Sequence, residues 1–164
     1  GESPDPELIA KITETVLNHK MVIGVHDIVV HDYGPGRRIV SLHAEVPYNK
    51  DMMEVHDLMD HIEMRLMEEY HCEATIHMDP VVTDDGEVNE TRKEVFNIVK
   101  KYDKTLSVHD FRMVKGPTHT NVIFDLVIPY GKDYEPEKIV KDLKQKIKDE
   151  MQGKHYAVIR VDRF

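Results

Sequence analysis

The sequence predicts an α+β protein made of two tandem copies of one small unit, each with the order helix, strand, strand, helix, strand. Segments with helical and with alternating apolar periodicity follow one another in this order twice. Short motifs also recur at a nearly constant offset. Gly34-Pro35 returns as Gly116-Pro117 after 82 residues, and Val25-His26-Asp27 returns as Val108-His109-Asp110 after 83. Each copy is therefore expected to be an open-faced sandwich, with two helices covering one face of a sheet.

The first copy begins with a helix signal. Asp5-Pro6 combines an N-cap residue with a proline suited to the first helical position, and the helix is expected to end near residues 19–20. A run rich in β-branched residues and an alternating apolar segment predict the first two strands, and a stripe with helical spacing predicts the second helix. The expected elements are strands at 21–30, 40–46 and 74–79 and a second helix over 55–66.

The second copy repeats this order after a polar stretch that contains Asp84-Asp85-Gly86. We expect helices at 90–102 and 139–147 and strands at 106–113, 122–128 and 156–162. The predicted domains are residues 1–82 and 90–164, joined by a linker at 83–89. Because each copy is too small to bury a large core, the copies are expected to pack on one another or on a partner chain.

Composition narrows the class of protein. The chain has 164 residues and a net charge of −9, which argues against nucleic-acid binding and suits a protein that attracts cations. No apolar run is long enough to span a bilayer. Cys72 is the only cysteine, which indicates a reducing compartment without disulfides. Gly1 is interpreted as an expression remnant, so the chain would be an excised piece of a longer protein.

Histidines and a carboxylate form the main chemical signal. His77 and Asp79 are two apart on a predicted strand and so share one face, and His43 lies on the polar face of another strand. With His26 and His56 they form a potential ligand set for zinc or a similar ion, in one site or in two sites bridged by Asp79. The pattern alone fits scattered surface histidines equally well.

These residues carry a resemblance to a known family. The motifs Gly24-Val25-His26-Asp27, His43-Ala44-Glu45-Val46, His56-Asp57 and Ile76-His77-Met78-Asp79-Pro80 resemble the cytoplasmic C-terminal domain of cation diffusion facilitator transporters. The resemblance covers residues 5–82 and implies a ferredoxin-like (metallochaperone-like) fold. It also implies a homodimer on the cytoplasmic side of the cell membrane, attached to the transmembrane domain of the same protein and regulating cation efflux. By motif, the implied binuclear metal site uses His26, His43, His56, His77 and Asp79.

The second copy is a degenerate repeat. His43, His56 and His77 align with Asp125, Lys138 and Arg160, and Asp79 aligns with Asp162. We expect Lys138 and Arg160 to supply, near Asp125 and Asp162, the positive charge that an ion supplies in the first copy. No nucleophile with a base and no glycine-rich phosphate loop is present, so an enzyme is not expected. The metal stays open between Zn²⁺, Mn²⁺, Fe²⁺, Co²⁺ and Cd²⁺. A soluble tandem module that senses small molecules is the alternative function.

Overall fold

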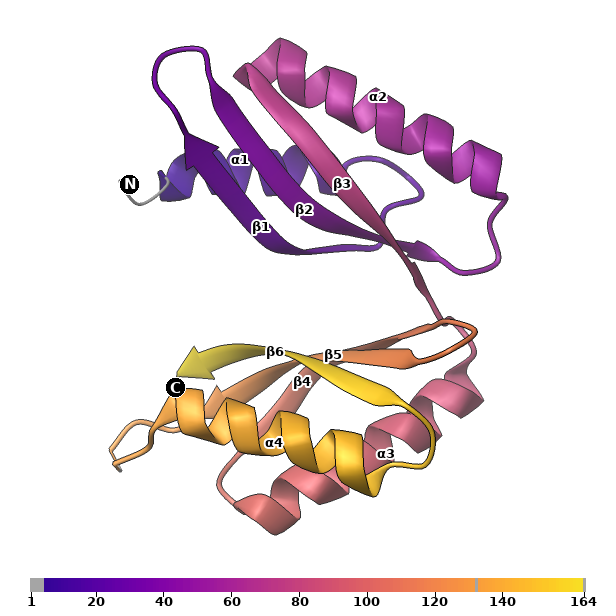
Figure 1. Ribbon diagram of the computed structural model, residues 1–164, viewed down its shortest axis with the longest axis vertical. Helices are drawn as coiled ribbons and strands as arrows, with labels where there is room; N and C mark the ends of the chain where they lie inside the picture. The colour runs from indigo at the N-terminus through magenta and orange to yellow at the C-terminus, as the bar shows by residue number, and fades with distance from the viewer. Residues whose placement is uncertain (1–4, 132, 164) are drawn as a thin grey trace. The chain divides into compact units, whose positions relative to one another are not determined.

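The computed structural model divides into two compact units, residues 1–80 and 81–164 (Figure 1). It describes residues 5–131 and 133–163. Gly1 and the outermost ends of the two predicted domains lie outside the described residues. The order of elements within each unit is helix, strand, strand, helix, strand, which confirms the predicted α+β class with a tandem repeat.

The first unit contains two helices and three neighbouring strands. Its elements are α1 (Pro6–Leu17), β1 (Gly24–Asp32), β2 (Arg38–Pro47), α2 (Met52–Tyr70) and β3 (Cys72–Val81). Both helices begin at capping carboxylates. Asp5 accepts a hydrogen bond from the backbone N–H of Glu7, and Asp51 accepts from those of Met53 and Glu54. Strand β2 lies between β1 and β3, so side chains from all three strands can meet above its centre.

The core of the first unit lies between the two helices and one face of this sheet. Alternate residues of β2, including Leu42 and Ala44, are buried against Ile12 of α1 and Ile62 of α2. His43 lies between them in sequence and points to the opposite face. That face carries no helix of this unit in the described residues, and we call it the open face.

The second unit repeats this arrangement with its own core. Its elements are α3 (Asp85–Tyr102), β4 (Ser107–Lys115), β5 (Thr120–Ile128), α4 (Pro136–Glu150) and β6 (His155–Arg163). Strand β5 pairs antiparallel with β4 and parallel with β6. The fully buried Phe124 of β5 packs among Val99 of α3 and Leu143 of α4, so this unit also has one helix-covered and one open face.

The connection between the repeats is shorter than the sequence suggested. Residues 85–89, assigned to the linker at 83–89, form the start of α3. Asp84 caps this helix by accepting a hydrogen bond from the backbone N–H of Glu87, and the acidic residues Asp85 and Glu87 favour the positive end of the helix dipole. The polar composition that resembled a linker is therefore the composition of a helix N-terminus.

Each unit has the same irregularity in its first strand. Between the pairs His26↔His43 and Val29↔Ser41, β1 has two residues where β2 has one, which is a β-bulge. Strand β4 has an equivalent bulge after His109. The first residue of each bulge is an aspartate with positive φ, 52° at Asp27 and 53° at Asp110. The bulge is thus a property of the repeat and not of one copy.

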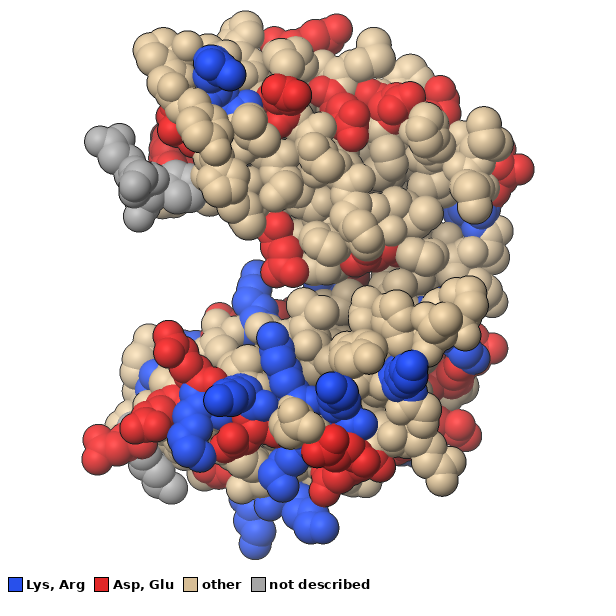
Figure 2. All heavy atoms as spheres, viewed as in Figure 1, with Lys and Arg blue, Asp and Glu red and all other residues tan. Residues whose placement is uncertain are grey.

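The negative charge of the chain belongs to the first unit. Residues 1–80 hold 16 Asp and Glu against 6 Lys and Arg, a net charge of −10, whereas residues 81–164 hold 15 against 16, a net charge of +1. Figure 2 shows the consequence on one face, where most Lys and Arg side chains lie on the second unit. Among the described residues, no helix has the length and apolar character that crossing a membrane requires.

The Asp84 cap gives a test of the revised start of α3. Replacing Asp84 with Ala should lower the free energy of unfolding of the second unit by about 1 kcal/mol, because the N–H of Glu87 loses its acceptor. Glu90→Ala is the matched control, since it removes the same charge from the second turn of α3 and leaves the cap in place. Urea unfolding of both variants measures the difference, and equal stabilities would contradict the assigned cap.

Candidate metal centre

Four of the predicted ligands meet on the open face of the first unit. His26 comes from β1, His43 from β2, and His77 and Asp79 from β3. The ring centroids of His26 and His43 are 4.6 Å apart, and those of His43 and His77 are also 4.6 Å apart. Three imidazoles from three strands therefore form a row across the sheet.

The Asp79 carboxylate is the common partner of this row. Its Oδ1 lies 2.6 Å from His77 Nδ1, and its Oδ2 lies 3.2 Å from His43 Nδ1 and 3.3 Å from His26 Nε2. Although Asp79 is on the open face, its neighbours leave it only 6% exposed. A nearly buried carboxylate needs a positive partner, which protonated imidazoles or a metal ion can supply.

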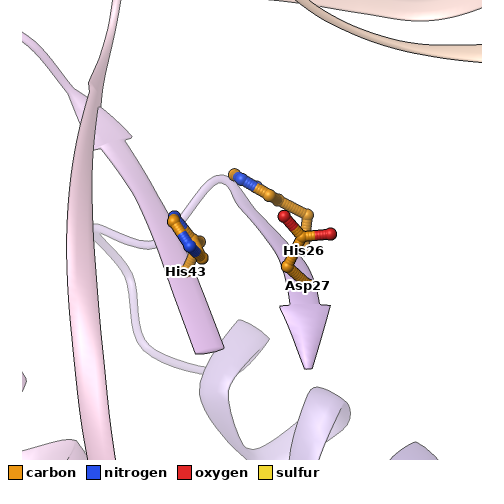
Figure 3. Close-up of side chains that lie close together, drawn as sticks. All are labelled: His26, Asp27 and His43. Atoms are coloured by element: carbon orange, nitrogen blue, oxygen red, sulfur yellow. The ribbon is translucent and has the colours of Figure 1, made fainter. Parts of the chain in front are cut away.

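Two overlapping groups of side chains have the spacing to hold an ion. One is His43, His77 and Asp79, and the other is His26, Asp27 and His43; within each group, one ligand atom per residue lies within 4.8 Å of the others. Figure 3 shows the second group, with the Asp27 carboxylate next to the His26 ring and His43 on the neighbouring strand. Mixed nitrogen and oxygen ligands of this kind suit zinc and related first-row ions.

Glu45 was not among the predicted site residues, and it lies behind His26. Its Oε2 is 3.1 Å from His26 Nδ1, and the residue is 1% exposed. A proton on Nδ1 donated to Glu45 leaves Nε2 as the free lone pair, which is how a second layer of residues fixes a metal-binding imidazole. Gly24 makes room for this contact, because a Cβ there would lie 2.7 Å from Glu45 Oε2. In the sequence Glu45 looks like an ordinary solvated residue of an alternating strand.

His56 is the predicted ligand that the chain does not bring to the site. It lies in the first turns of α2, on the helix-covered side of the sheet, whereas the other ligands are on the open face. Its side chain is 71% exposed, and its Nδ1 is 3.8 Å from Asp60 Oδ2. In the part of the chain that the structure describes, neither possible ion-binding group includes His56.

The second unit has a different set of contacts at the equivalent positions. Asp125 and Arg160 are paired in register on β5 and β6, and Arg160 Nη2 lies 3.3 Å from Asp125 Oδ2. The expected contact between Arg160 and Asp125 is confirmed. The expectation for Lys138 is wrong, because its Nζ lies 2.9 Å from Asp142 Oδ2, one turn along α4. Like His56, Lys138 is on the helix side and cannot reach the open face.

Asp125 also has an acidic neighbour. Burial raises the pKa of this carboxyl, a hydrogen bond with Asp110 raises it further, and the Arg160 guanidinium opposes both effects. Asp110 is the positive-φ residue of the β4 bulge, so it occupies the place that Asp27 has in the first unit. The bulge therefore brings its aspartate to the neighbouring strand in both copies.

The structure defines a small α+β domain present in two copies, and comparison with known proteins gives the family. A family model described as "Cation efflux protein, cytoplasmic domain" matches residues 4–81 and again residues 88–164. The chain belongs to this family, which confirms the resemblance to cation diffusion facilitator domains. These are domains of transporters and not enzymes. The match favours this class over the small-molecule-sensing module that the sequence left open.

Individual relatives match about half of the chain. An uncharacterized transporter of Methanocaldococcus jannaschii, MJ0449, is 40% identical over 82 residues, which are 49% of this chain and 29% of that transporter. A structure of CzrB, a candidate zinc transporter, has a TM-score of 0.45 and 27% identity over 48% of this chain and 98% of its own. The zinc form of CzrB has a TM-score of 0.43 and 27% identity, and the match covers 53% of this chain and 96% of the CzrB chain. The chain thus spans less than a third of the length of the transporter it matches.

The raised pKa of Asp125 predicts a pH dependence of stability. A folded-state pKa above the unfolded value means that the folded unit holds the proton more tightly, so this contribution is present at low pH and is lost as pH rises through the folded-state pKa. The Asp125→Asn side chain cannot titrate, so this variant does not lose stability through that group as pH rises. The advantage of the parent over Asp125→Asn should therefore shrink from pH 4 to pH 7.

Arg160→Gln provides the matched test of this pH dependence. It removes the cation that lowers the pKa of Asp125, so the loss of stability with rising pH should become steeper than in the parent. Chemical unfolding at a series of pH values measures all three proteins. Curves that stay parallel for all three would contradict the assigned environment of Asp125.

Proposed function

We propose that this chain is the metal-binding, regulatory and dimerisation domain of a divalent cation efflux transporter, and that its metal is Zn²⁺. The observation that carries the proposal is the convergence of His43, His77 and Asp79 from two strands, with His26 beside them. Zinc takes nitrogen and oxygen ligands in small, often tetrahedral sets, and the row offers such a set. Mn²⁺, Fe²⁺, Co²⁺ and Cd²⁺ compete for the same ligand types.

The charge of the first unit supports cation binding. A net charge of −10 on residues 1–80 raises the local concentration of cations, whereas the second unit is nearly neutral. An ion at Asp79 would also neutralise a carboxylate that the fold almost removes from water. The proposal therefore assigns metal binding to the first unit and none to the second, where Arg160 already faces Asp125.

Ion binding can act on the shape and stability of the first unit because the ligands come from different strands. One ion would join β2 to β3 through His43 and His77, and His26 extends the contact to β1. A ligand at 100 times its Kd stabilises the folded state by about 2.7 kcal/mol. We propose that this gain in rigidity is the signal passed to the transmembrane domain of the full-length protein, on the cytoplasmic side of the membrane.

The proposed homodimer rests on the family and on exposed apolar surface. Several large apolar side chains of the first unit are 44% or more exposed, and such groups are typical of protein contacts: Leu17, Ile23, Val29, Met52, Met53, Met64 and Met67. Within one chain His56 has no proposed role. A second copy could present its His56 to the open face only if its α2 packed against that face.

Removal of the central ligands tests the metal site. The double variant His77→Ala/Asp79→Ala should lose saturable zinc binding in calorimetric titration, because loss of even an outer-shell group typically costs about 10- to 100-fold in affinity. The matched control is Arg160→Ala/Asp162→Ala, which changes the equivalent positions of the second copy and should bind zinc as the parent does. Affinity of the parent should weaken below about pH 6, where imidazoles take up protons. Unchanged binding by the first variant would refute the site.

Zinc-dependent shape and assembly test the regulatory role. Light scattering of the parent should give a mass near twice that of the monomer, and small-angle X-ray scattering should change when zinc is added and revert with a chelator. The double variant should keep its scattering curve in both conditions. A small-molecule sensor would show no response to zinc or chelator in either protein, and that result would overturn the proposal.

A further inference from the structure

The outer faces of α2 and α4 carry charged stripes of opposite sign. We propose that α2 of one chain docks on α4 and β6 of a second copy of the same chain, and that this contact, made twice, forms the homodimer. The inference rests on the proposed homodimer and names the surfaces that build it. Figure 2 shows acidic side chains over α2 and many Lys and Arg side chains over α4.

A groove of about 430 Å³ runs along α4 beside β6. It is lined mainly by apolar side chains of both elements and by three exposed lysines of α4: Val140, Tyr156, Ala157, Lys141, Lys144 and Lys148. One acidic residue, Glu137, lies at the end nearest the start of α4. Tyr156 is 40% exposed, and Lys148 Nζ lies 5.9 Å from the centre of its ring. The groove therefore combines apolar surface with positive charge, which suits an acidic amphipathic helix.

The outer face of α2 is such a helix surface. It carries a stripe whose members are separated by four, three, four and three positions, and the buried residues of α2 lie on the other side: Met53, Asp57, Asp60, Met64 and Met67. The three methionines are 47% or more exposed, and the side chains of Asp57 and Asp60 are 75% and 58% exposed. Exposed methionines on a helix are typical of surfaces that bind other proteins.

The charges of the two helices match in number and spacing. Asp57 and Lys141 are each the sixth residue of their helix, and Asp60 and Lys144 are each the ninth. Two carboxylates three positions apart can therefore meet two ammonium groups three positions apart, whether the helices run parallel or antiparallel. In both directions the flanking methionines of α2 lie toward the ends of the groove.

The contacts of the two aspartates within α2 leave their charge in place. Asp57 Oδ2 lies 3.3 Å from His61 Nε2, and Asp60 Oδ2 lies 3.8 Å from His56 Nδ1. A neutral imidazole does not cancel a carboxylate charge, whereas a lysine ammonium does at neutral pH. Each aspartate thus gains more from a lysine of a partner than from its neighbouring histidine.

Charge complementarity identifies the occupant of the groove as a second copy of this chain. Two first units, each with a net charge of −10, repel one another, so contact with the partner's second unit, at +1, is favoured. In a twofold dimer, the contact of α2 with the partner's α4 is repeated by symmetry, so both grooves are filled. This arrangement places α2 on the partner's second unit and not on the open face of its first.

The experiment reverses each stripe separately. Asp57→Lys/Asp60→Lys places positive charge on both helices, and Lys141→Glu/Lys144→Glu places negative charge on both. Because like charges then meet, each variant alone should dimerise at least about tenfold more weakly than the parent. An equimolar mixture should form a one-to-one dimer with a Kd within about threefold of the parent value, since each contact again joins opposite charges. Sedimentation equilibrium over a range of protein concentrations measures all three cases.

A matched control separates this contact from a general effect of charge. Lys146→Glu/Lys154→Glu makes the same change in net charge at exposed lysines outside the groove, and it should dimerise as the parent does. Urea unfolding of each variant checks that both units remain folded.

The outcomes separate this inference from the proposed function. If each variant alone dimerises as the parent does, the inference is overturned and the homodimer stands on another surface. If the mixture stays monomeric, the stripes do not meet between copies, and the inference is also overturned. If the parent is a monomer at every concentration, the proposed homodimer fails together with this inference, while zinc calorimetry still decides the metal site.

Discussion

The open face of the first unit is organised around one nearly buried carboxylate. Asp79 is 6% exposed and has three imidazoles as its neighbours, and a neutral imidazole does not balance a negative charge. This face is therefore well suited to a bound cation. In the second unit Arg160 takes the place of His77, and its guanidinium, which keeps its charge, lies beside Asp125. The two copies share the same backbone, including the bulge, but they differ in the groups on the open face. The second unit has an arginine where the first has a histidine.

Much of this arrangement could be predicted from the sequence, because it depends on local periodicity. The alternation of apolar residues in β2 predicts that His43 faces away from the helices, and spacing of two puts His77 and Asp79 together. The Asp5-Pro6 signal predicts the start of α1. The repeat predicts that the second unit has the same fold. Each of these inferences needs only neighbouring residues or a comparison of the chain with itself.

The sequence is least informative where a side chain's position depends on tertiary structure. Motif similarity grouped His56 with the other ligands, but α2 packs on the opposite side of the sheet, and one chain cannot bring them together. The position of Asp27 near His26 and His43 was not predicted, because a single inserted residue reverses the face that alternation predicts. Glu45 was missed because its burial depends on the space beside Gly24. In each case the deciding fact is a contact between segments that are distant in the sequence.

The pair of Arg160 and Asp125 allows the second unit to serve as an internal reference for measurements on the first unit. An arginine cannot be stripped by a chelator, so a spectroscopic label near Asp125 reports temperature, ionic strength and crowding, but not metal. A label at the equivalent place near His43 would report all of these and also the ion that we propose for the first unit. Both labels stand at equivalent positions of the same fold in the same chain. The difference between their signals would therefore contain the effect of the ion without the effects of temperature, ionic strength and crowding.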